Sequence, residues 1–303
     1  MKIIVTGGAG FIASHIVDAY ILQGYKVVVV DNLSTGFRKN LNPKAKFYKA
    51  DIKNLKQLRA IFRKEKPQIV SHHAAIAEVA KSLRDPLHTF ATNVGGTVNV
   101  LLCSGEAGIS RFIFASTGGA IYGEPKKIPV DEHAPTVPLS PYGLSKLLDE
   151  ECIKYYAAHY GFSYTIFRYT NVYGPRQNPK GEAGVVAIFG GLMKAGKRPI
   201  IFGDGTKVRD YLFVSDIVHA NKKAILQKGS HLMNLGLGKP VRDREIFDTI
   251  AEIVKFRGRP IFKPFRTGEV YKITIDAHRA KKIIGWEPSV MLKEGLYRTL
   301  KEL

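Results

Sequence analysis

The first 31 residues of the chain constrain its fold more than any other segment. A β-branched run at 2–6 leads directly into the glycine-rich segment 7–13. An apolar pattern at helical spacing then ends near Gly24, and a second apolar run at 26–30 ends in Asp31. A strand, a glycine turn, a helix, a second strand and an acidic residue in this order are typical of a dinucleotide-binding βαβ unit.

Five residues of this unit are placed to contact a dinucleotide. Gly7 and Gly10 let the backbone approach a pyrophosphate, and Phe11 and Ile12 begin a helix whose N-terminus offers free N–H groups. Asp31, at the end of the second strand, would bond both ribose hydroxyls and repel a 2′-phosphate. We therefore predict that the cofactor is NAD rather than NADP.

A second constellation lies in the middle of the chain. Tyr142 and Lys146 are four residues apart, so they share one face if the segment is helical. An ammonium group close to a phenol stabilises the phenolate and lowers the tyrosine pKa from about 10, which suits proton transfer with a sugar or alcohol hydroxyl near neutral pH. This spacing also occurs on ordinary helix surfaces, so its weight comes from the dinucleotide unit. Thr117 ends a buried-strand pattern and is expected at the carboxyl edge of the sheet, where ligands bind.

Strand and helix patterns alternate through the first half of the chain. The alternation predicts a doubly wound parallel α/β sheet (Rossmann type) with helices on both faces. The expected strands lie near 2–6, 26–30, 46–50, 68–71, 111–116 and 163–168. After about residue 170 glycine, proline and asparagine accumulate. We expect an NAD-binding domain over 1–170 and mainly a smaller substrate lobe over 171–303. Part of 207–245 should return to the sheet, through a strand at 211–214 and the helix that follows.

Composition limits the other possible functions. The formal net charge is +20, but the basic residues are spread along the chain and form no nucleic-acid-binding motif, so we expect no nucleic-acid partner. A positive surface favours an anionic substrate, and lysine enrichment also occurs in heat-adapted proteins. No apolar stretch approaches the roughly 18 residues of a membrane span, and the chain begins with a core strand. We expect a cytoplasmic protein without membrane association.

Histidine and cysteine positions do not predict a metal site. His72 and His73 end a buried-strand pattern without further ligands nearby in the sequence. Cys103 and Cys152 are far apart and lie in helical patterns, so we interpret them as buried, unreactive thiols.

Several longer segments closely resemble the UDP-glucose 4-epimerase family of extended short-chain dehydrogenases/reductases. The resemblance runs from Met1 to about residue 288, and one departure is Ala13 at the position of the third family glycine. The segments that carry it are 7–13, 31–36, 121–123, 140–146, 168–176 and 202–211. These motifs are specific for nucleotide-sugar enzymes and less specific for the sugar.

The resemblance implies a reaction and a role for each central residue. A bound NAD removes a hydride from C4 of a UDP-hexose and returns it to the other face of the 4-keto intermediate. Tyr142 takes the O4 proton, Lys146 holds the nicotinamide ribose and lowers the Tyr142 pKa, and Thr117 bonds O4.

The resemblance also implies further binding residues. Asp51 and Ile52 would hold the adenine ring, and Asn93 would lie on the cofactor side. Asp51 as a strand-end turn and Asn93 as a helix cap are the structural alternatives. The remaining cofactor residues, in the segment after the second strand, are Asn32, Ser34, Thr35 and Gly36. The UDP diphosphate would be held by Asn171, Arg209 and Arg266.

Two alternatives concern the reaction. A nucleotide-sugar 4,6-dehydratase needs an acid and a base beside Thr117, whereas this chain has Gly118 and Gly119 there. A 4-epimerase of UDP-glucuronate or of a UDP-N-acetylhexosamine stays open, because Ile273 at the sugar-pocket position does not decide between the sugars. Glu269 also departs from the family aspartate.

The resemblance further implies a symmetric homodimer. The helical segments 86–107 and 142–159 would pair into a four-helix interface. The apolar residues expected to contribute are Phe90, Val94, Leu101, Leu102, Leu147, Leu148, Tyr155 and Tyr156.

Overall fold

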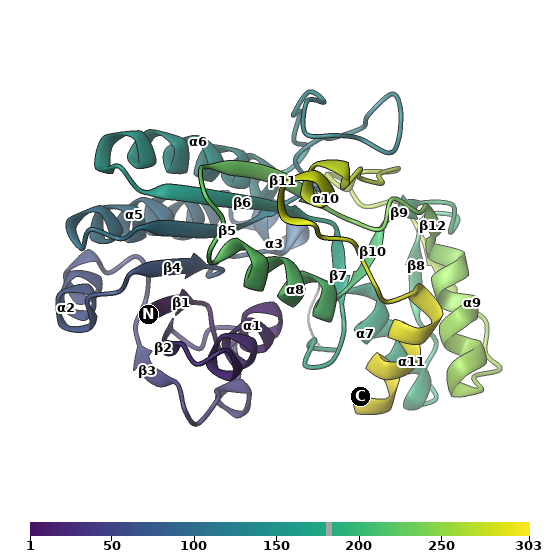
Figure 1. Cartoon of the computed structure of the whole chain (residues 1–303). Coiled ribbons are helices and arrows are strands. Elements are labelled where there is room, and N and C mark those ends of the chain that lie inside the picture. The colour runs from purple at the N-terminus through teal and green to yellow at the C-terminus, as the bar shows by residue number, and fades with distance from the viewer. Residues whose placement is uncertain (180–183) are drawn as a thin grey trace.

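A computed structural model describes residues 1–179 and 184–303 (Figure 1). Its centre is a seven-stranded sheet in the order β11-β6-β5-β4-β1-β2-β3, in which every neighbouring pair is parallel. The strands are β1 (Lys2–Thr6), β2 (Lys26–Asp31), β3 (Lys46–Lys49), β4 (Ile69–His72), β5 (Arg111–Thr117), β6 (Ser163–Tyr169) and β11 (His231–Leu235). The predicted doubly wound parallel sheet is confirmed.

Helices cover both faces of this sheet (Figure 1). One face carries α1 (Phe11–Leu22) and α8 (Val214–Ala224), and the other carries α2 (Leu55–Glu65), α5 (Gly96–Glu106) and α6 (Pro141–Tyr160). Alternate residues of one strand point to opposite faces. Ile3 accordingly packs in the core beneath α1 and α8, while Ile4 packs in the core beneath α2 and α5.

A smaller lobe with its own apolar core lies beyond the sheet. Its main helices are α7 (Val185–Lys194), α9 (Asp243–Val254) and α11 (Leu292–Glu302). Three short strand pairs accompany them: β7 (Asn171–Tyr173) with β10 (Tyr211–Phe213), β8 (Ile200–Phe202) with β13 (Ile261–Lys263), and β9 (Val208–Arg209) with β12 (Val241–Arg242). The remaining elements are the 3-10 helix η1 (Arg38–Asn40), the π-helical turn η2 (Ala91–Gly95), and the helices α3 (Val79–Arg84), α4 (Pro86–Phe90) and α10 (His278–Ile284).

The strand that returns to the sheet is not the expected one. The run at 211–214 was expected to do so, but β10 pairs with β7 outside the main sheet. Within 207–245 the strand β11 joins the sheet beside β6 instead, with Leu235 opposite Tyr169. The physical reason is the fit of each strand to its surroundings. Met233 and Leu235 complete the core beneath α8, whereas Phe213 packs against Tyr173 in the smaller lobe.

Candidate active site

The glycine turn after β1 packs so closely on the backbone after β4 that a side chain at Gly7 would not fit. Gly7 has a φ of +70°, and a Cβ atom there would lie 2.7 Å from the Ala74 backbone nitrogen. Gly10 is the N-cap of α1, and no side chain caps this helix end. Phe11 and Ile12 form the first helical turn. Free N–H groups beside a strained, side-chain-free turn fit a pyrophosphate.

Asp31 lies against this turn. Its carboxylate accepts hydrogen bonds from the backbone nitrogens of Ala9 at 3.0 Å and Leu33 at 2.7 Å, and its side chain is buried. Gly36 packs on the same turn, since a Cβ there would lie 2.9 Å from the Ala9 backbone. The loop after β2 is thereby fixed beside the place where a dinucleotide ribose would lie.

The other residues predicted near the adenosine half gather at the ends of β2 and β3. Asn32 donates to Asp51 at 3.1 Å, and Asp51 also accepts from the Lys53 nitrogen at 2.8 Å. The strand-end turn considered for Asp51 is therefore present. Ile52 is buried against α5, whereas Ser34 and Thr35 are exposed on the loop after β2.

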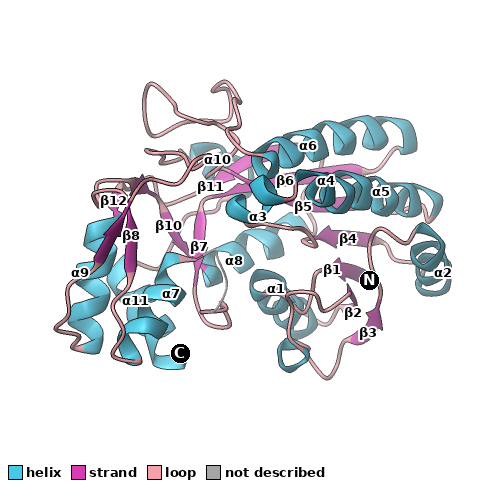
Figure 2. Ribbon diagram, turned by 180° about the vertical axis from the view of Figure 1, so that it is seen from behind, coloured by secondary structure: helices cyan, strands magenta, loops and turns pink. Residues whose placement is uncertain are grey.

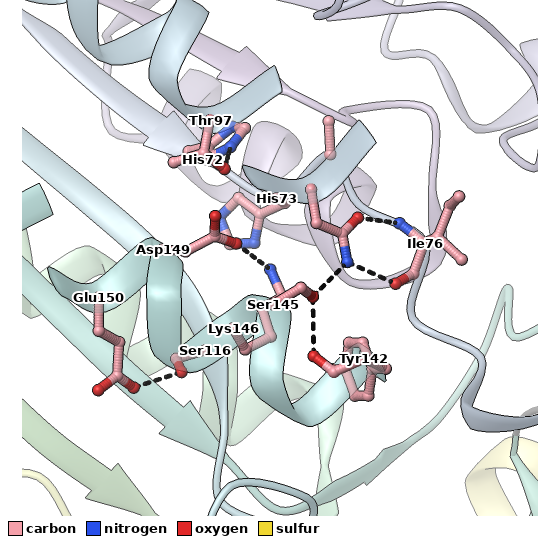
Figure 3. A network of polar contacts seen from close by, with 12 residues as sticks. His72, His73, Ile76, Thr97, Ser116, Tyr142, Ser145, Lys146, Asp149 and Glu150 are labelled. Atoms are coloured by element: carbon pink, nitrogen blue, oxygen red, sulfur yellow. Dashed lines mark hydrogen bonds and ion pairs between the residues drawn. The ribbon is translucent and has the colours of Figure 1, made fainter. Parts of the chain in front are cut away.

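Asn93 joins three segments around the site. Its amide group donates to the Ile76 oxygen at 3.0 Å and the Ser145 hydroxyl at 2.9 Å, and accepts from the Ile76 nitrogen at 2.8 Å. The Ser145 hydroxyl in turn donates to the Tyr142 backbone oxygen at 2.8 Å (Figure 3). Asn93 lies within η2 and is no helix cap. It fixes the first turn of α6, and thus Tyr142, to the loop after β4.

Two of the residues predicted to be catalytic lie together at the carboxyl end of β5, and the third follows on the next helix. The helix α6 begins at Pro141, where the Ser140 side chain caps it by accepting from the Gly143 nitrogen at 3.2 Å. Tyr142 lies in the first turn, where the Thr117 hydroxyl interacts with its phenol and favours the charged form. Lys146 lies one turn further along α6 and is almost fully buried.

The expected lowering of the Tyr142 pKa by Lys146 is wrong for this structure. Although part of the ring stays exposed, desolvation by the surrounding protein raises the pKa of Tyr142 to about 12, and the Thr117 hydrogen bond opposes this only in part. The Lys146 ammonium lies 4.0 Å from an Asp149 oxygen and 4.4 Å from the centre of the Phe114 ring. The Asp149 charge offsets that of Lys146, and itself raises the Tyr142 pKa.

The sequence reasoning missed a buried charged network beneath these residues. Glu150 receives two hydrogen bonds from the Arg168 guanidinium, at 2.6 and 2.9 Å, and a third from the Ser116 hydroxyl. Arg168 also donates to the Tyr122 hydroxyl at 2.9 Å. Two signals were available: Glu150 lies eight residues after Tyr142, on the same helix face, and Arg168 interrupts an apolar strand.

The predicted substrate residues lie along the smaller lobe and its junction with the sheet. Asn171 begins β7, and a Cβ at Gly119 would lie 3.2 Å from its side-chain oxygen. Arg209 donates to the Val208 oxygen at 2.9 Å and the Tyr271 oxygen at 3.1 Å. These contacts hold the Arg209 side chain against the segment that precedes Ile273.

Arg266 is the more open of the two arginines. Its guanidinium lies 3.5 Å from the centre of the Phe202 ring and 3.7 Å from a Glu269 oxygen. Ile273 is buried against Ile121 and Tyr122, so it fills the space beneath the loop after β5.

The two histidines at the end of β4 make hydrogen bonds, although the Nδ1 of His73 has no partner within the described part of the chain. His72 bonds Thr6 at 2.6 Å and Thr97 at 2.9 Å, and His73 bonds Ser71 at 2.9 Å. Within residues 1–179 and 184–303, no three histidine, cysteine or acidic side chains gather as a metal site would require. The same residues contain no helix long and apolar enough to cross a membrane.

Comparison with known proteins gives one consistent family. Residues 3–236 match the NAD dependent epimerase/dehydratase family. A UDP-glucose 4-epimerase of Mycolicibacterium smegmatis is 38% identical, with 99% of this chain and 98% of that protein covered. A crystal structure of UDP-glucose 4-epimerase with UDP-glucose from Thermotoga maritima is 46% identical, covering 100% of this chain and 98% of that chain at a TM-score of 0.98.

A second solved structure gives the same result with a different ligand. The Thermus thermophilus UDP-glucose 4-epimerase in complex with NAD is 37% identical, with a TM-score of 0.95 and coverage of 100% and 98% of the two chains. Both likenesses extend over the sheet and the smaller lobe alike, so the resemblance inferred from short motifs is confirmed. The chain belongs to the NAD dependent epimerase/dehydratase family.

Proposed function

We propose that this protein is an NAD-dependent 4-epimerase of UDP-hexoses that interconverts UDP-glucose and UDP-galactose through a 4-keto intermediate. The observation that carries the proposal is the Tyr142 phenol beside Thr117 at the carboxyl end of β5, with Lys146 buried one helical turn further along α6. The names of the relatives support the same reaction, since proteins of this fold at 37–46% identity are UDP-glucose 4-epimerases.

The cofactor site fits NAD. Gly7, Gly10, Phe11 and Ile12 would hold the pyrophosphate, for the steric reasons given by the glycine turn. Asp31 keeps unused lone pairs after its two backbone hydrogen bonds, so it can also accept from ribose hydroxyls. The rest of the predicted cofactor set is Asn32, Ser34, Thr35, Gly36, Asp51, Ile52, Asn93, Tyr142 and Lys146. When bound, NAD would supply the hydride acceptor, a nicotinamide ring that is positively charged in the oxidised form and becomes neutral when it takes the hydride.

We assign proton transfer to Tyr142 and binding of the sugar O4 to Thr117. The phenol, with a pKa raised to about 12, is neutral at pH 7 until positive charge is brought near it. Thr117, beside that phenol, would hold the sugar O4 in line with Tyr142. Positive charge near the phenol would lower its pKa and let Tyr142 act as a phenolate that takes the O4 proton while the hydride leaves C4 for the cofactor. Return of the hydride to the other face of the 4-keto sugar, with the proton given back by Tyr142, would complete the epimerisation.

The smaller lobe supplies groups for the UDP moiety. We assign Asn171, Arg209 and Arg266 to the substrate diphosphate, because guanidinium groups bind phosphate in a bidentate manner. Arg266 stacks on Phe202 while one of its nitrogens lies 3.7 Å from Glu269, and the other edge donors of the guanidinium would face a phosphate. The net charge of +20 adds a long-range attraction for the anionic substrate.

The dehydratase alternative is not favoured. A Cβ at Gly118 would lie 2.7 Å from the Ile275 side chain, and one at Gly119 would lie 3.2 Å from the Asn171 oxygen. The acid and base that water elimination requires beside Thr117 are therefore missing, and the space for them is restricted. The product assay described below decides whether UDP-glucuronate or a UDP-N-acetylhexosamine is the substrate instead.

We also propose that the protein is a homodimer. Figure 2 shows α4, α5 and α6 close together, and several large apolar side chains are exposed on α4 and α6. They are Leu87, Leu144, Leu148 and Tyr155, of which Tyr155 is 67% exposed. Leu101 is fully buried in the monomer core and cannot contribute, contrary to the sequence interpretation. A cytoplasmic location is proposed as well, since both cysteines are free thiols.

A product assay tests the proposed function. The purified protein is incubated separately with UDP-glucose, UDP-galactose, UDP-N-acetylglucosamine and UDP-glucuronate, and the products are resolved by anion-exchange chromatography. We expect UDP-glucose and UDP-galactose to reach the same equilibrium mixture from either side. Faster conversion of UDP-N-acetylglucosamine or UDP-glucuronate would replace the proposed substrate, and conversion of none would reject the reaction.

A further inference from the structure

Asp149 is a buried acid that the proposed mechanism does not use. It lies on α6, three residues after Lys146, and its side chain is fully inaccessible to solvent. One of its oxygens lies 4.0 Å from the Lys146 nitrogen, and Figure 3 shows the two groups pointing toward each other. Neither oxygen makes a hydrogen bond of ordinary geometry within the described part of the chain.

Groups on α6 itself, on α5 and at the end of β4 surround Asp149. On α6 itself, Tyr142, Lys146, Glu150 and Cys152 interact with it electrostatically. The hydroxyl of Thr97 on α5 stabilises its charged form. His72 and His73 lie at the end of β4 close to Lys146 and Asp149 (Figure 3), and burial lowers both of their pKa values, that of His73 to about 3. The histidines are therefore neutral at pH 7, and Lys146 is the cation that faces Asp149.

The neighbouring acid, Glu150, forms its hydrogen bonds with residues other than Lys146. Glu150 receives two hydrogen bonds from Arg168 and one from Ser116, so Arg168 balances most of its charge, and its effect on the Lys146 pKa is in the same direction as that of Asp149 but smaller. Lys146 itself is only 3% exposed, and its other close neighbour is the face of the Phe114 ring. A buried ammonium without a counter-charge loses its proton readily.

We propose that Asp149 is a positioning residue that keeps Lys146 protonated in this dry site and so sets the upper pH limit for binding the nicotinamide half of NAD. The inference rests on the proposed function through the assignment of Lys146 to the nicotinamide ribose. It goes beyond that function by naming the residue of α6 that stabilises the protonated form of Lys146.

The charges of the two groups predict a distinctive pH dependence. Burial lowers the pKa of Lys146, and Asp149 opposes this shift. Burial raises the pKa of Asp149 to about 7, so Asp149 is largely protonated at pH 6 and ionised at pH 9. Asparagine has the shape of protonated aspartic acid. Asp149→Asn should therefore resemble the wild type at pH 6, and lose the counter-charge only at alkaline pH.

The test measures NAD affinity by calorimetry, from pH 6 to pH 9.5, on protein stripped of nucleotide. We expect Asp149→Asn to bind NAD within about twofold of the wild type at pH 6 and at least tenfold more weakly at pH 9. Asp149→Ser, which is smaller but equally uncharged, should show the same divergence if charge is the cause. The matched control is Glu151→Gln, which removes an exposed acid of the same helix that is paired with Lys154.

The outcomes separate this inference from the proposed function. Loss of affinity by an equal factor at pH 6 and pH 9 would mean that Asp149 acts through packing alone, and would overturn the inference. Identical profiles for Asp149→Asn and the wild type would overturn it too. NAD binding needs no sugar, so it can be measured whatever the product assay shows. Failure of the wild type to bind NAD would instead reject the proposed function.

Discussion

The buried pair of Glu150 and Arg168 gives the most quantitative prediction. The two side chains are 0% and 4% exposed, and two hydrogen bonds of 2.6 and 2.9 Å join them. Glu150→Gln keeps the size of the side chain but leaves the Arg168 charge without a counter-charge in the protein interior. Removal of one partner of a buried ion pair destabilises a protein by about 3–5 kcal/mol.

This free energy converts into a measurable change in melting temperature. An unfolding entropy of roughly 2.1 cal/mol/K per residue gives about 0.64 kcal/mol/K for a chain of this length. We therefore expect Glu150→Gln to melt about 5–8 °C below the wild type in differential scanning calorimetry. Because Ser116, which precedes Thr117, loses its charged acceptor, kcat should fall more than KM rises.

A double variant identifies the cause. Glu150→Gln combined with Arg168→Met removes the unpaired charge and should melt at a higher temperature than Glu150→Gln alone. Glu151→Gln, which breaks an exposed pair on the same helix, should shift the free energy of unfolding by less than about 1 kcal/mol. Two results would refute the reasoning. One is a Glu150→Gln protein that melts within 2 °C of the wild type, and the other is a double variant that is less stable than Glu150→Gln alone.

Three further predictions concern the site and the assembly. Tyr142→Phe should lower kcat by about 10²-fold or more at unchanged melting temperature, because it removes only the proton-transferring hydroxyl; near-normal turnover would contradict the assigned role. Asp31→Asn should weaken NAD binding and reduce the preference for NAD over NADP, measured by titration with each nucleotide; an unchanged preference would show that Asp31 only fixes the glycine turn. Leu148→Glu should reduce the mass seen by light scattering from about twice 33.6 kDa to that value, whereas a wild type already at 33.6 kDa would exclude the dimer.

The sequence predicted the sheet because its signals are local. A glycine turn between strand and helix depends on φ angles and close backbone approach, which are properties of Gly7 and its immediate neighbours. Parallel strands place their carboxyl ends at one edge, so Asp31 and Thr117 could be assigned to that edge before the structure was known. Helical spacing likewise placed Tyr142 and Lys146 together.

The features that the sequence did not predict depend on long-range packing. The runs 211–214 and His231–Leu235 are both short and apolar, and their partners are decided by the cores that they complete. The Tyr142 pKa was predicted from Lys146 alone, whereas the structure adds desolvation and the opposite charge of Asp149. Asp149 was not considered from the sequence; its position three residues after Lys146 is compatible with contact on a helix, but its burial could not be inferred from spacing.

The two adjacent acids of α6, the helix that carries Tyr142, have different partners. Asp149 faces Lys146 and the cofactor side of the site, while Glu150 faces Arg168 and the strands that carry Thr117. Buried charges of this kind contribute little to stability compared with apolar residues of the same size. The Glu150–Arg168 pair joins α6 to β6, whereas the Asp149–Lys146 pair lies within α6 and acts on the charge of the lysine. Substitution of either acid should therefore disturb one side at a time: NAD affinity at alkaline pH for Asp149, and turnover with stability for Glu150.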